Sequence, residues 1–199
     1  MVTESVPITG VILAGGLGRR LGGSDKGLVE VEGWPLIDRV IAAFGPQVQQ
    51  LLINANRNIQ EYERYGYPVV PDELPGYQGP LAGMLTGLLN ASNTHVVFVP
   101  CDALSLPPDL VARLWESMRS NDAEVCIAHD GTRMHPVFAL LDRRLAGSLQ
   151  GYLESGGRGV EDWVLQQKHA VVDFSDCPQG FVNLNTPEDL EGVTLHNPG

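Results

Sequence analysis

The sequence is poor in positive charge and has no long apolar run. Its 199 residues contain 13 lysines and arginines against 24 aspartates and glutamates, a formal net charge of −11. This balance disfavours a general electrostatic grip on nucleic acid or on an anionic membrane. The longest apolar stretches, at residues 6–14 and 94–100, fall well short of the roughly 18 residues that a membrane-spanning helix needs. We therefore expect a soluble protein with no nucleic-acid or membrane partner, in which any phosphate ligand is held by a local arrangement of residues.

Cysteine is scarce and odd in number. Cys101, Cys126 and Cys177 lie far apart and form no C-x-x-C pair, which speaks against a disulfide framework or a zinc site. The first five residues lack the basic region of a secretory signal. We therefore expect a cytoplasmic location.

The first half of the chain alternates apolar strands with amphipathic helices. Buried strands are predicted at residues 8–13, 51–53 and 95–99, and helices at 35–44, 80–89 and 108–119. Near-continuous β-branched runs suit strands covered on both faces of a parallel sheet, and Pro35 and Pro80 suit the first turn of a helix. The alternation predicts an α/β fold with a doubly wound, mostly parallel sheet.

The second half is less regular. A strand at 124–128, a turn at 129–131 and a strand at 135–141 predict an antiparallel pair, and helices at 142–154 and 159–167 and a strand at 170–174 follow. No repeat or break in composition marks a linker. We therefore expect a single domain over residues 1–199, with a small antiparallel subregion.

A glycine-rich loop follows the first strand. Residues 13–27 read LAGGLGRRLGGSDKG, in which Arg19, Arg20 and Lys26 place three of the 13 cations within eight residues. Glycines let backbone N–H groups approach phosphate oxygens closely, and ligands of open α/β sheets bind at the carboxyl ends of the strands. The loop therefore predicts an anion site, although a surface loop with solvated charges is the alternative. It is neither a Walker P-loop, because Gly27 follows Lys26, nor a dinucleotide fingerprint, because residue 21 is leucine.

Polar side chains also follow the other predicted strands. Asp102 closes the third strand, where a carboxylate suits magnesium held jointly with substrate phosphates. Asn54 follows the second strand and offers an amide that can donate to and accept from a purine edge. Asp72 can accept from guanine N–H groups or from ribose hydroxyls, and for both residues a role in a turn is the alternative. His135 is interpreted as a satisfied, partly buried imidazole at least as readily as a substrate contact.

The motifs resemble those of a known family. The loop at 13–27 resembles the signature of the nucleotide-diphospho-sugar transferase superfamily, and its form is similar to that of the molybdenum cofactor guanylyltransferases. The resemblance continues, in the expected order, through the motifs at residues 54–57, 79–84, 100–102, 135–136 and 181–190. It therefore covers nearly the whole chain.

The resemblance implies a Rossmann-like nucleotidyltransferase that transfers GMP from GTP to the terminal phosphate of molybdenum-bearing molybdopterin and releases pyrophosphate. It implies Mg²⁺ on Asp102, catalytic roles for Arg19, Lys26 and Asp102, and transient contacts with molybdenum cofactor biosynthesis proteins and recipient enzymes. The implied GTP-binding residues are Leu13, Ala14, Gly15, Gly16, Lys26, Asn54, Asp72 and Asp102.

The two halves of the chain are expected to divide the substrates. About residues 6–105 would bind GTP, and about 106–192 would bind the pterin acceptor. Asn183 and Asn185 are candidates to contact the metal or the acceptor, or to support residues that do, and Arg158 is a candidate to contact a phosphate. Turn or solvated-loop roles are the alternatives for these three. Two rival functions stay open, namely a related nucleotidyltransferase such as a cytidylyltransferase with another phosphorylated acceptor, and a non-catalytic nucleotide-binding regulator.

Overall fold

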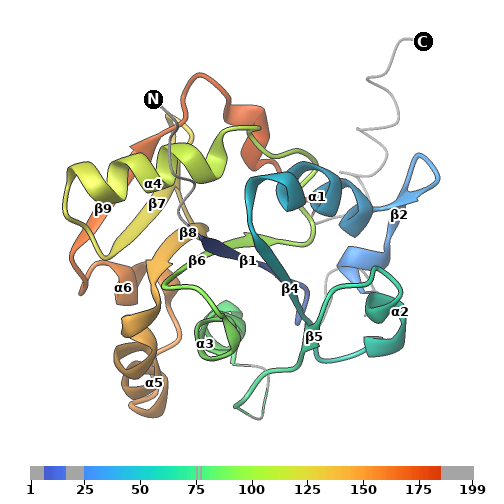
Figure 1. Ribbon diagram of the computed structural model, residues 1–199, viewed down its shortest axis with the longest axis horizontal. Coiled ribbons are helices and arrows are strands. Elements are labelled where there is room, and N and C mark those ends of the chain that lie inside the picture. Colours follow the sequence, from blue (N-terminus) through green and yellow to red (C-terminus); the bar gives the residue numbers. More distant parts are fainter. Residues whose placement is uncertain (1–6, 17–24, 75, 77, 185–199) are drawn as a thin grey trace.

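The computed structural model describes residues 7–16, 25–74, 76 and 78–184, and a seven-stranded sheet runs through its centre (Figure 1). The strand order is β5-β4-β1-β6-β8-β7-β9. The strands are β1 (Ile8–Leu13), β4 (Gln50–Asn54), β5 (Val69–Val70), β6 (His95–Pro100), β7 (Val125–His129), β8 (Met134–Asp142) and β9 (His169–Asp173). A separate hairpin joins β2 (Glu30–Val31) to β3 (Trp34–Pro35).

The four strands β5, β4, β1 and β6 are parallel, as the buried apolar runs predict. Val11 of β1 is in register with Leu52 on one side and with Phe98 on the other. The carboxyl ends of β1, β4 and β6 therefore meet at one edge of the sheet. The predicted doubly wound, mostly parallel α/β fold is confirmed.

The antiparallel subregion is centred on β8, which pairs antiparallel with both β6 and β7. The partner of Ile127 is Ala139, but the partner of the next residue, Ala128, is His135. Residues 136–138 are thus extra in β8, a bulge that bends the strand at the same edge where β6 ends. β9 pairs parallel with β7 and forms one edge of the sheet.

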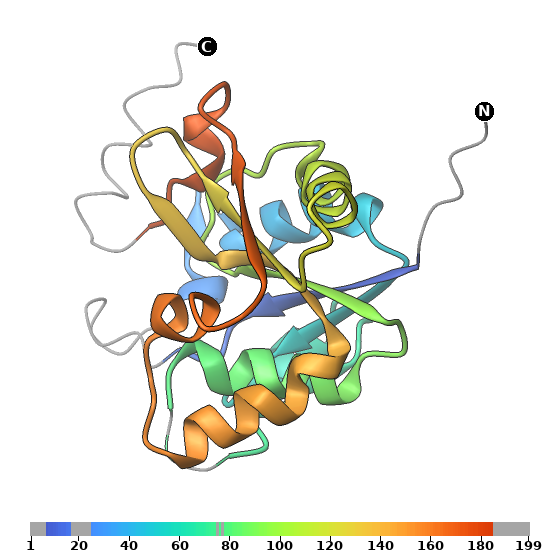
Figure 2. The same cartoon turned by 90° about the vertical axis from the view of Figure 1, so that its left-hand side faces the viewer.

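The helices cover both faces of the sheet (Figures 1 and 2). They are α1 (Leu36–Phe44), α2 (Ile59–Glu63), α3 (Pro80–Asn90), α4 (Leu110–Ser120), α5 (Ala146–Glu154) and α6 (Val160–Val164). The helix predicted at 142–154 opens with a 3₁₀ turn, Arg143–Leu145, because the Asp142 carboxylate accepts from the N–H of Arg144. The helix predicted at 159–167 is α6 and is shorter.

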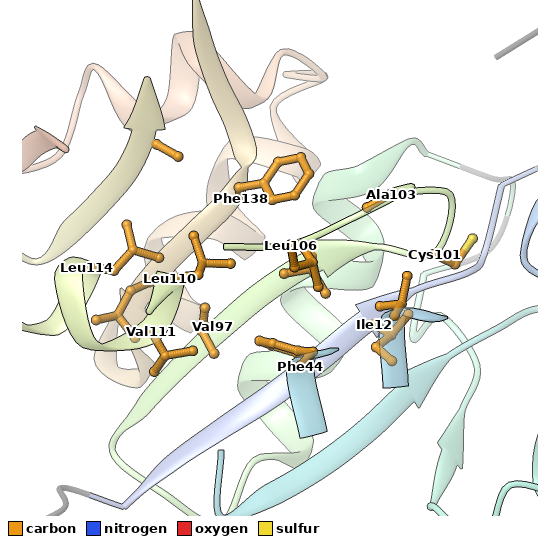
Figure 3. Packing of buried hydrophobic residues seen from close by; sticks show 14 of the residues in the cluster. Ile12, Phe44, Val97, Cys101, Ala103, Leu106, Leu110, Val111, Leu114 and Phe138 are labelled. Atoms are coloured by element: carbon orange, nitrogen blue, oxygen red, sulfur yellow. The ribbon is translucent and has the colours of Figure 1, made fainter. Parts of the chain in front are cut away.

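Two apolar cores lie on opposite faces of the sheet. Side chains alternate along a strand, so Ile12 packs with α1 and α4 on one face whereas Val11 packs with α3 on the other. Figure 3 shows Phe44 of α1 and Leu110, Val111 and Leu114 of α4 around the first core. In the part of the chain that the structure describes, no helix is long and apolar enough to cross a membrane.

Candidate active site

A cavity of about 270 Å³ opens at the carboxyl ends of β1, β4 and β6, beside the first turn of α3. Its wall combines the glycine loop, polar side chains from the strand ends and a few small apolar groups. The lining residues are Leu13, Ala14, Gly15, Gly16, Lys26, Asn54, Asp72, Gly79, Pro80, Gly83, Pro100, Cys101, Asp102 and Val137. The predicted GTP-binding residues, 13–16, Lys26, Asn54, Asp72 and Asp102, are all among them.

One end of the cavity holds a lysine–carboxylate pair. Lys26 begins a 3₁₀ turn after the glycine loop, Asp102 follows β6, and Lys26 Nζ lies 2.8 Å from Asp102 Oδ2. The Asp102 side chain is only 9% exposed and that of Lys26 is 23% exposed. A carboxylate this deeply buried needs a compensating charge, and Lys26 supplies it. Cation and anion therefore lie together in the cavity wall.

Asp25, the residue before Lys26, is fastened to α2. Its buried carboxylate accepts from Tyr62 Oη at 2.5 Å and from Asn58 Nδ2 at 3.0 Å, and Arg57 Nε lies 3.6 Å away. Burial raises the pKa of Tyr62 well above its ordinary value, with the nearby Cys101 and Asp25 adding to the shift. The phenol therefore stays protonated and donates to Asp25 throughout the physiological pH range. This anchor fixes the backbone on which Lys26 stands.

Gly27 is the tight point of the same turn. A Cβ there would lie 2.6 Å from Tyr62 Oη and 3.3 Å from Cys101 Cβ, which is too close for the first contact. Burial raises the pKa of the Cys101 thiol well above its usual range, so Cys101 is the small, inert neighbour that the sequence indicates. Glycine is needed at residue 27 because the turn packs directly on α2 and on the end of β6.

The other end of the cavity holds a carboxylate oriented by two asparagines. Asn54 Nδ2 donates to Asp72 Oδ1 at 2.9 Å and to the Val70 carbonyl at 3.1 Å. Asn56 Nδ2 donates to Asp72 Oδ2 at 2.8 Å, and Asn56 Oδ1 accepts from the backbone N–H of Asp72 at 2.8 Å. Both amide hydrogens of Asn54 are therefore used within the protein, and its Oδ1 is directed to the region between Gly15 and Gly83. In this conformation Asn54 is left to accept from a ligand through Oδ1, and its contact with a base stays a prediction.

The segment at residues 182–184 runs along the backbone that carries Asp102. Ala103 and Asn183 form an antiparallel bridge, Leu184 N donates to the Asp102 carbonyl at 3.0 Å, and Leu104 N donates to the Val182 carbonyl at 3.0 Å. Asn183 thus lies next to Asp102 in space although it does not line the cavity. Arg19 and Asn185, also predicted as site residues, lie outside the residues that the structure describes.

Arg158 lies elsewhere. Its guanidinium donates to the carbonyls of Leu153 and Gly157, at the C-terminal end of α5, where a cation interacts favourably with the helix dipole. It does not line the cavity. In this conformation Arg158 acts as a helix cap, and an acceptor contact stays a prediction.

His135 is a buried imidazole with a hydrogen-bond partner, which is one of the two interpretations that the sequence allows. Its Nε2 lies 2.7 Å from Asp130 Oδ2, and its ring stacks on Phe181 and meets the edge of Phe138. The Asp130 pKa is held well below its usual range by hydrogen bonds from Thr132 and from His135. The imidazole is 7% exposed, so it is a structural part of the β7–β8 region.

Sequence reasoning missed part of the cavity wall and the residues that hold it. Gly79, Pro80 and Gly83 belong to the motif at residues 79–84, and a glycine–proline helix start beside a strand end is a signal that would have found them. Val137 reaches the cavity through the bulge in β8, and nothing in the local sequence indicates it. The role of Asn56 is not indicated by its motif at residues 54–57, because its partner Asp72 is 16 residues away.

The sheet and the edge cavity define a nucleotidyltransferase class of α/β protein, and comparisons identify the family. The chain matches the model of the MobA-like NTP transferase domain over residues 10–171. It is 48% identical over 190 residues to a molybdenum cofactor guanylyltransferase of Shewanella loihica, covering 96% of this chain and 97% of the relative. It is 46% identical over 184 residues to that of Shewanella halifaxensis, with 92% of each chain covered. The chain therefore belongs to the molybdenum cofactor guanylyltransferase family of MobA-like NTP transferases.

A solved structure supports the same fold. Molybdopterin-guanine dinucleotide biosynthesis protein A from Archaeoglobus fulgidus superposes with a TM-score of 0.79, covering 93% of this chain and 96% of that one, at 22% sequence identity. At this identity the likeness speaks for the fold alone.

Proposed function

We propose that this chain transfers GMP from GTP to the terminal phosphate of molybdenum-bearing molybdopterin, forming a guanine dinucleotide cofactor and releasing pyrophosphate. Relatives 46–48% identical over nearly their whole length carry the name of this activity. The observation that carries the proposal is the composition of one cavity. The Lys26–Asp102 pair lies at one end and the Asn54–Asp72 pair at the other, and Gly15 of the glycine loop lies beside Asn54 and Asn56. A nucleoside triphosphate needs both a phosphate site and a base site.

The chemistry requires little from a protein base. The terminal phosphate of the pterin is already an anionic nucleophile for the α-phosphorus of GTP, so the protein must bring two polyanions together and offset the charge on the leaving pyrophosphate. We assign the loop amides, Lys26 and Arg19 to the phosphates. Because the chain has a net charge of −11, this local set of donors must provide the attraction for the phosphates. Asp25, through Tyr62 and Asn58, positions Lys26 for this role.

Nucleotidyltransferases generally use a divalent metal ion, and we propose Mg²⁺ at Asp102. The fit rests on the donor set. Magnesium takes hard oxygen ligands and is usually held by one or two carboxylates together with substrate phosphates, and Asp102 offers a carboxylate in the cavity wall. Among the described residues no group of three or more histidine, cysteine or acidic side chains could hold a metal by itself, so the substrate would complete the site. When bound, the ion would offset charge on the transferring phosphates.

The two halves of the chain would share the work within one domain over residues 1–199. About residues 6–105 contribute nearly all of the cavity wall and would bind GTP. About 106–192 would bind the pterin, with Asn183 beside Asp102 and with Asn185 and Arg158 as further candidates. A cytoplasmic location and transient contacts with molybdenum cofactor biosynthesis proteins and recipient enzymes complete the proposal.

The test compares substrates in one assay. The protein is incubated with Mg²⁺, metal-loaded molybdopterin and one of GTP, ATP, CTP or UTP, and pyrophosphate and dinucleotide are measured. Pyrophosphate release with GTP that depends on the acceptor is expected. A preference for CTP would favour the related cytidylyltransferase. Nucleotide binding without turnover for any triphosphate would favour the regulator and refute the proposal.

A further inference from the structure

Asn56 lies behind the wall of the cavity at its base end and contacts the residues that form this wall. Asn56 does not line the cavity, yet its side chain makes three hydrogen bonds with the residues that do. It donates to Asp72 Oδ2 at 2.8 Å and to the Gly15 carbonyl at 3.3 Å, and it accepts from the Asp72 N–H at 2.8 Å. Any effect of Asn56 on a ligand must therefore pass through Asp72 and Gly15.

The orientation of this amide follows from its partners. A backbone N–H can only donate, so the atom of Asn56 that faces Asp72 N must be the oxygen, and the amide nitrogen then faces the carboxylate. Asn56 therefore forms two hydrogen bonds with Asp72, one to its main chain and one to its side chain. Asn54 holds the second carboxylate oxygen, Oδ1, at 2.9 Å. The plane of the Asp72 carboxylate is fixed by one amide on each oxygen.

A fixed carboxylate of this kind matches one base edge. Each carboxylate oxygen can accept more than one hydrogen bond, so both oxygens of Asp72, which lines the cavity, keep capacity to accept from a ligand. Guanine offers two adjacent donors on one edge, the N1–H and the 2-amino group, which a carboxylate can accept in parallel. Adenine presents an acceptor at N1, and hypoxanthine has the N1–H without the amino group. Rotation of the carboxylate would lose the parallel pair while leaving a charge in the same place.

We propose that Asn56 is a specificity-determining positioning residue: it orients the Asp72 carboxylate to accept the N1–H and the 2-amino group of guanine, and it ties that carboxylate to Gly15 of the phosphate loop. The inference rests on the proposed use of GTP and adds to it the atoms that recognise the base. Recognition of the base edge is thus assigned to Asp72, oriented by Asn56, and binding of the phosphates is assigned to the region around Lys26.

The test is the ratio of GTP to ITP affinity, measured by calorimetry with Mg²⁺, together with the affinity for ATP. ITP differs from GTP only by the missing 2-amino group, so its ratio to GTP reports that single contact. We expect the wild type to prefer GTP over ITP by roughly 10-fold or more, the worth of one hydrogen bond to a charged group. In Asn56→Asp the donor becomes a second carboxyl group facing Asp72, and the ratio should fall to near 1 at neutral pH.

Acidification provides a further readout. The introduced carboxyl can donate to Asp72 once it is protonated, so the GTP-to-ITP ratio of Asn56→Asp should rise again at lower pH. A merely structural role would produce no such recovery. Asn56→Ala removes the donor without adding charge and should lower the ratio at every pH. It also serves if Asn56→Asp fails to fold, which thermal unfolding of each variant reports.

Asn58→Asp is the matched control. Asn58 Nδ2 donates to the buried Asp25 carboxylate at 3.0 Å, so the substitution makes the same chemical change two residues away, at the phosphate end. It should weaken GTP and ITP by the same factor and leave their ratio unchanged. A wild-type ratio retained in Asn56→Asp and Asn56→Ala would overturn the inference alone.

Measurements on the wild type test the proposed use of GTP, on which the inference rests. Equal affinities for GTP and ATP would overturn the proposed use of GTP. A wild type that prefers GTP over ATP but binds ITP as tightly as GTP would instead place Asp72 on another group, such as a ribose hydroxyl, and would overturn the inference while leaving the proposed function standing.

Discussion

Two glycines one turn apart on α3 provide a test that separates the site from the stability of the fold. Gly83 lines the cavity and Gly87 does not. A Cβ on Gly83 would fall well within 3.0 Å of Asn54 Oδ1 and lie 2.9 Å from Leu13 Cδ2, whereas a Cβ on Gly87 would lie 2.6 Å from Phe98 Cε1 and 3.0 Å from Val11 Cγ2. Both substitutions to alanine therefore overpack, but against different neighbours.

The expected change in stability is similar for the two variants. Overpacking a core costs about 1–3 kcal/mol, and exchanging glycine for alanine within a helix returns about 1 kcal/mol. Each variant should therefore lose roughly 0–2 kcal/mol of unfolding free energy, which for a chain of this size lowers the melting temperature by a few degrees. Gly83→Ala must also move Asn54, which is 2% exposed and holds Asp72 Oδ1.

The affinity for GTP should distinguish them. Displacing Asn54 disturbs the carboxylate at the base end, so Gly83→Ala should weaken GTP by about 10-fold or more, the worth of one hydrogen bond to a charged group. Gly87→Ala should bind GTP within about twofold of the wild type, because its effect stays in the core. Thermal unfolding and calorimetry on both variants provide the measurements. Equal GTP affinities in the two variants would refute the assignment of the base end.

Three further substitutions test other parts of the site and the fold. Asp102→Asn should lower guanylyl transfer by about 10²–10³-fold while metal-free GTP affinity falls much less, as paired rate and binding measurements will show; near-normal turnover would contradict the metal assignment. Gly16→Ala should weaken GTP binding at an unchanged melting temperature, because among the described residues, its chain neighbours aside, none lies within 4 Å of the added Cβ; wild-type affinity would remove Gly16 from the site. Burial lowers the pKa of His95 from its ordinary value of 6.5, so the unfolded chain takes up the proton first and the stability of the fold decreases as the pH drops below that value. In urea unfolding, His95→Gln should therefore lose less stability than the wild type on acidification, and an equal loss in both proteins would contradict this.

The fold could be predicted because its determinants are local. The runs at residues 8–13 and 95–99 are apolar on both sides of the chain, and this indicates parallel strands buried on both faces. β5 is different, because it contains only Val69 and Val70 before Pro71. Two residues are too few to show the apolar pattern that identifies a strand. The β2–β3 hairpin was missed for the same reason, although Glu32 and Gly33 both have positive φ, the signature of a tight hairpin turn.

The site could be predicted only in part, because its contacts join distant residues. The strand ends place Gly15, Asn54 and Asp102 at one edge, and this was foreseen. The partnership of Lys26 with Asp102 spans 76 residues, and no spacing rule contains it. Nor does the sequence reveal that both amide hydrogens of Asn54 are used within the protein, since that depends on the carbonyl of Val70 in a neighbouring strand.

The segment that leaves β4 connects the two ends of the cavity, which explains why so short a motif is informative. Asn54 and Asn56 direct their amides to Asp72 at the base end. Asn58, two residues further on, directs its amide to Asp25, the residue before Lys26 at the phosphate end. One stretch of five residues therefore sets both carboxylates, so a shift of the backbone there would disturb base and phosphate recognition together. A substitution that removes one amide disturbs only one end, and single-residue exchanges within this stretch are therefore able to separate the two.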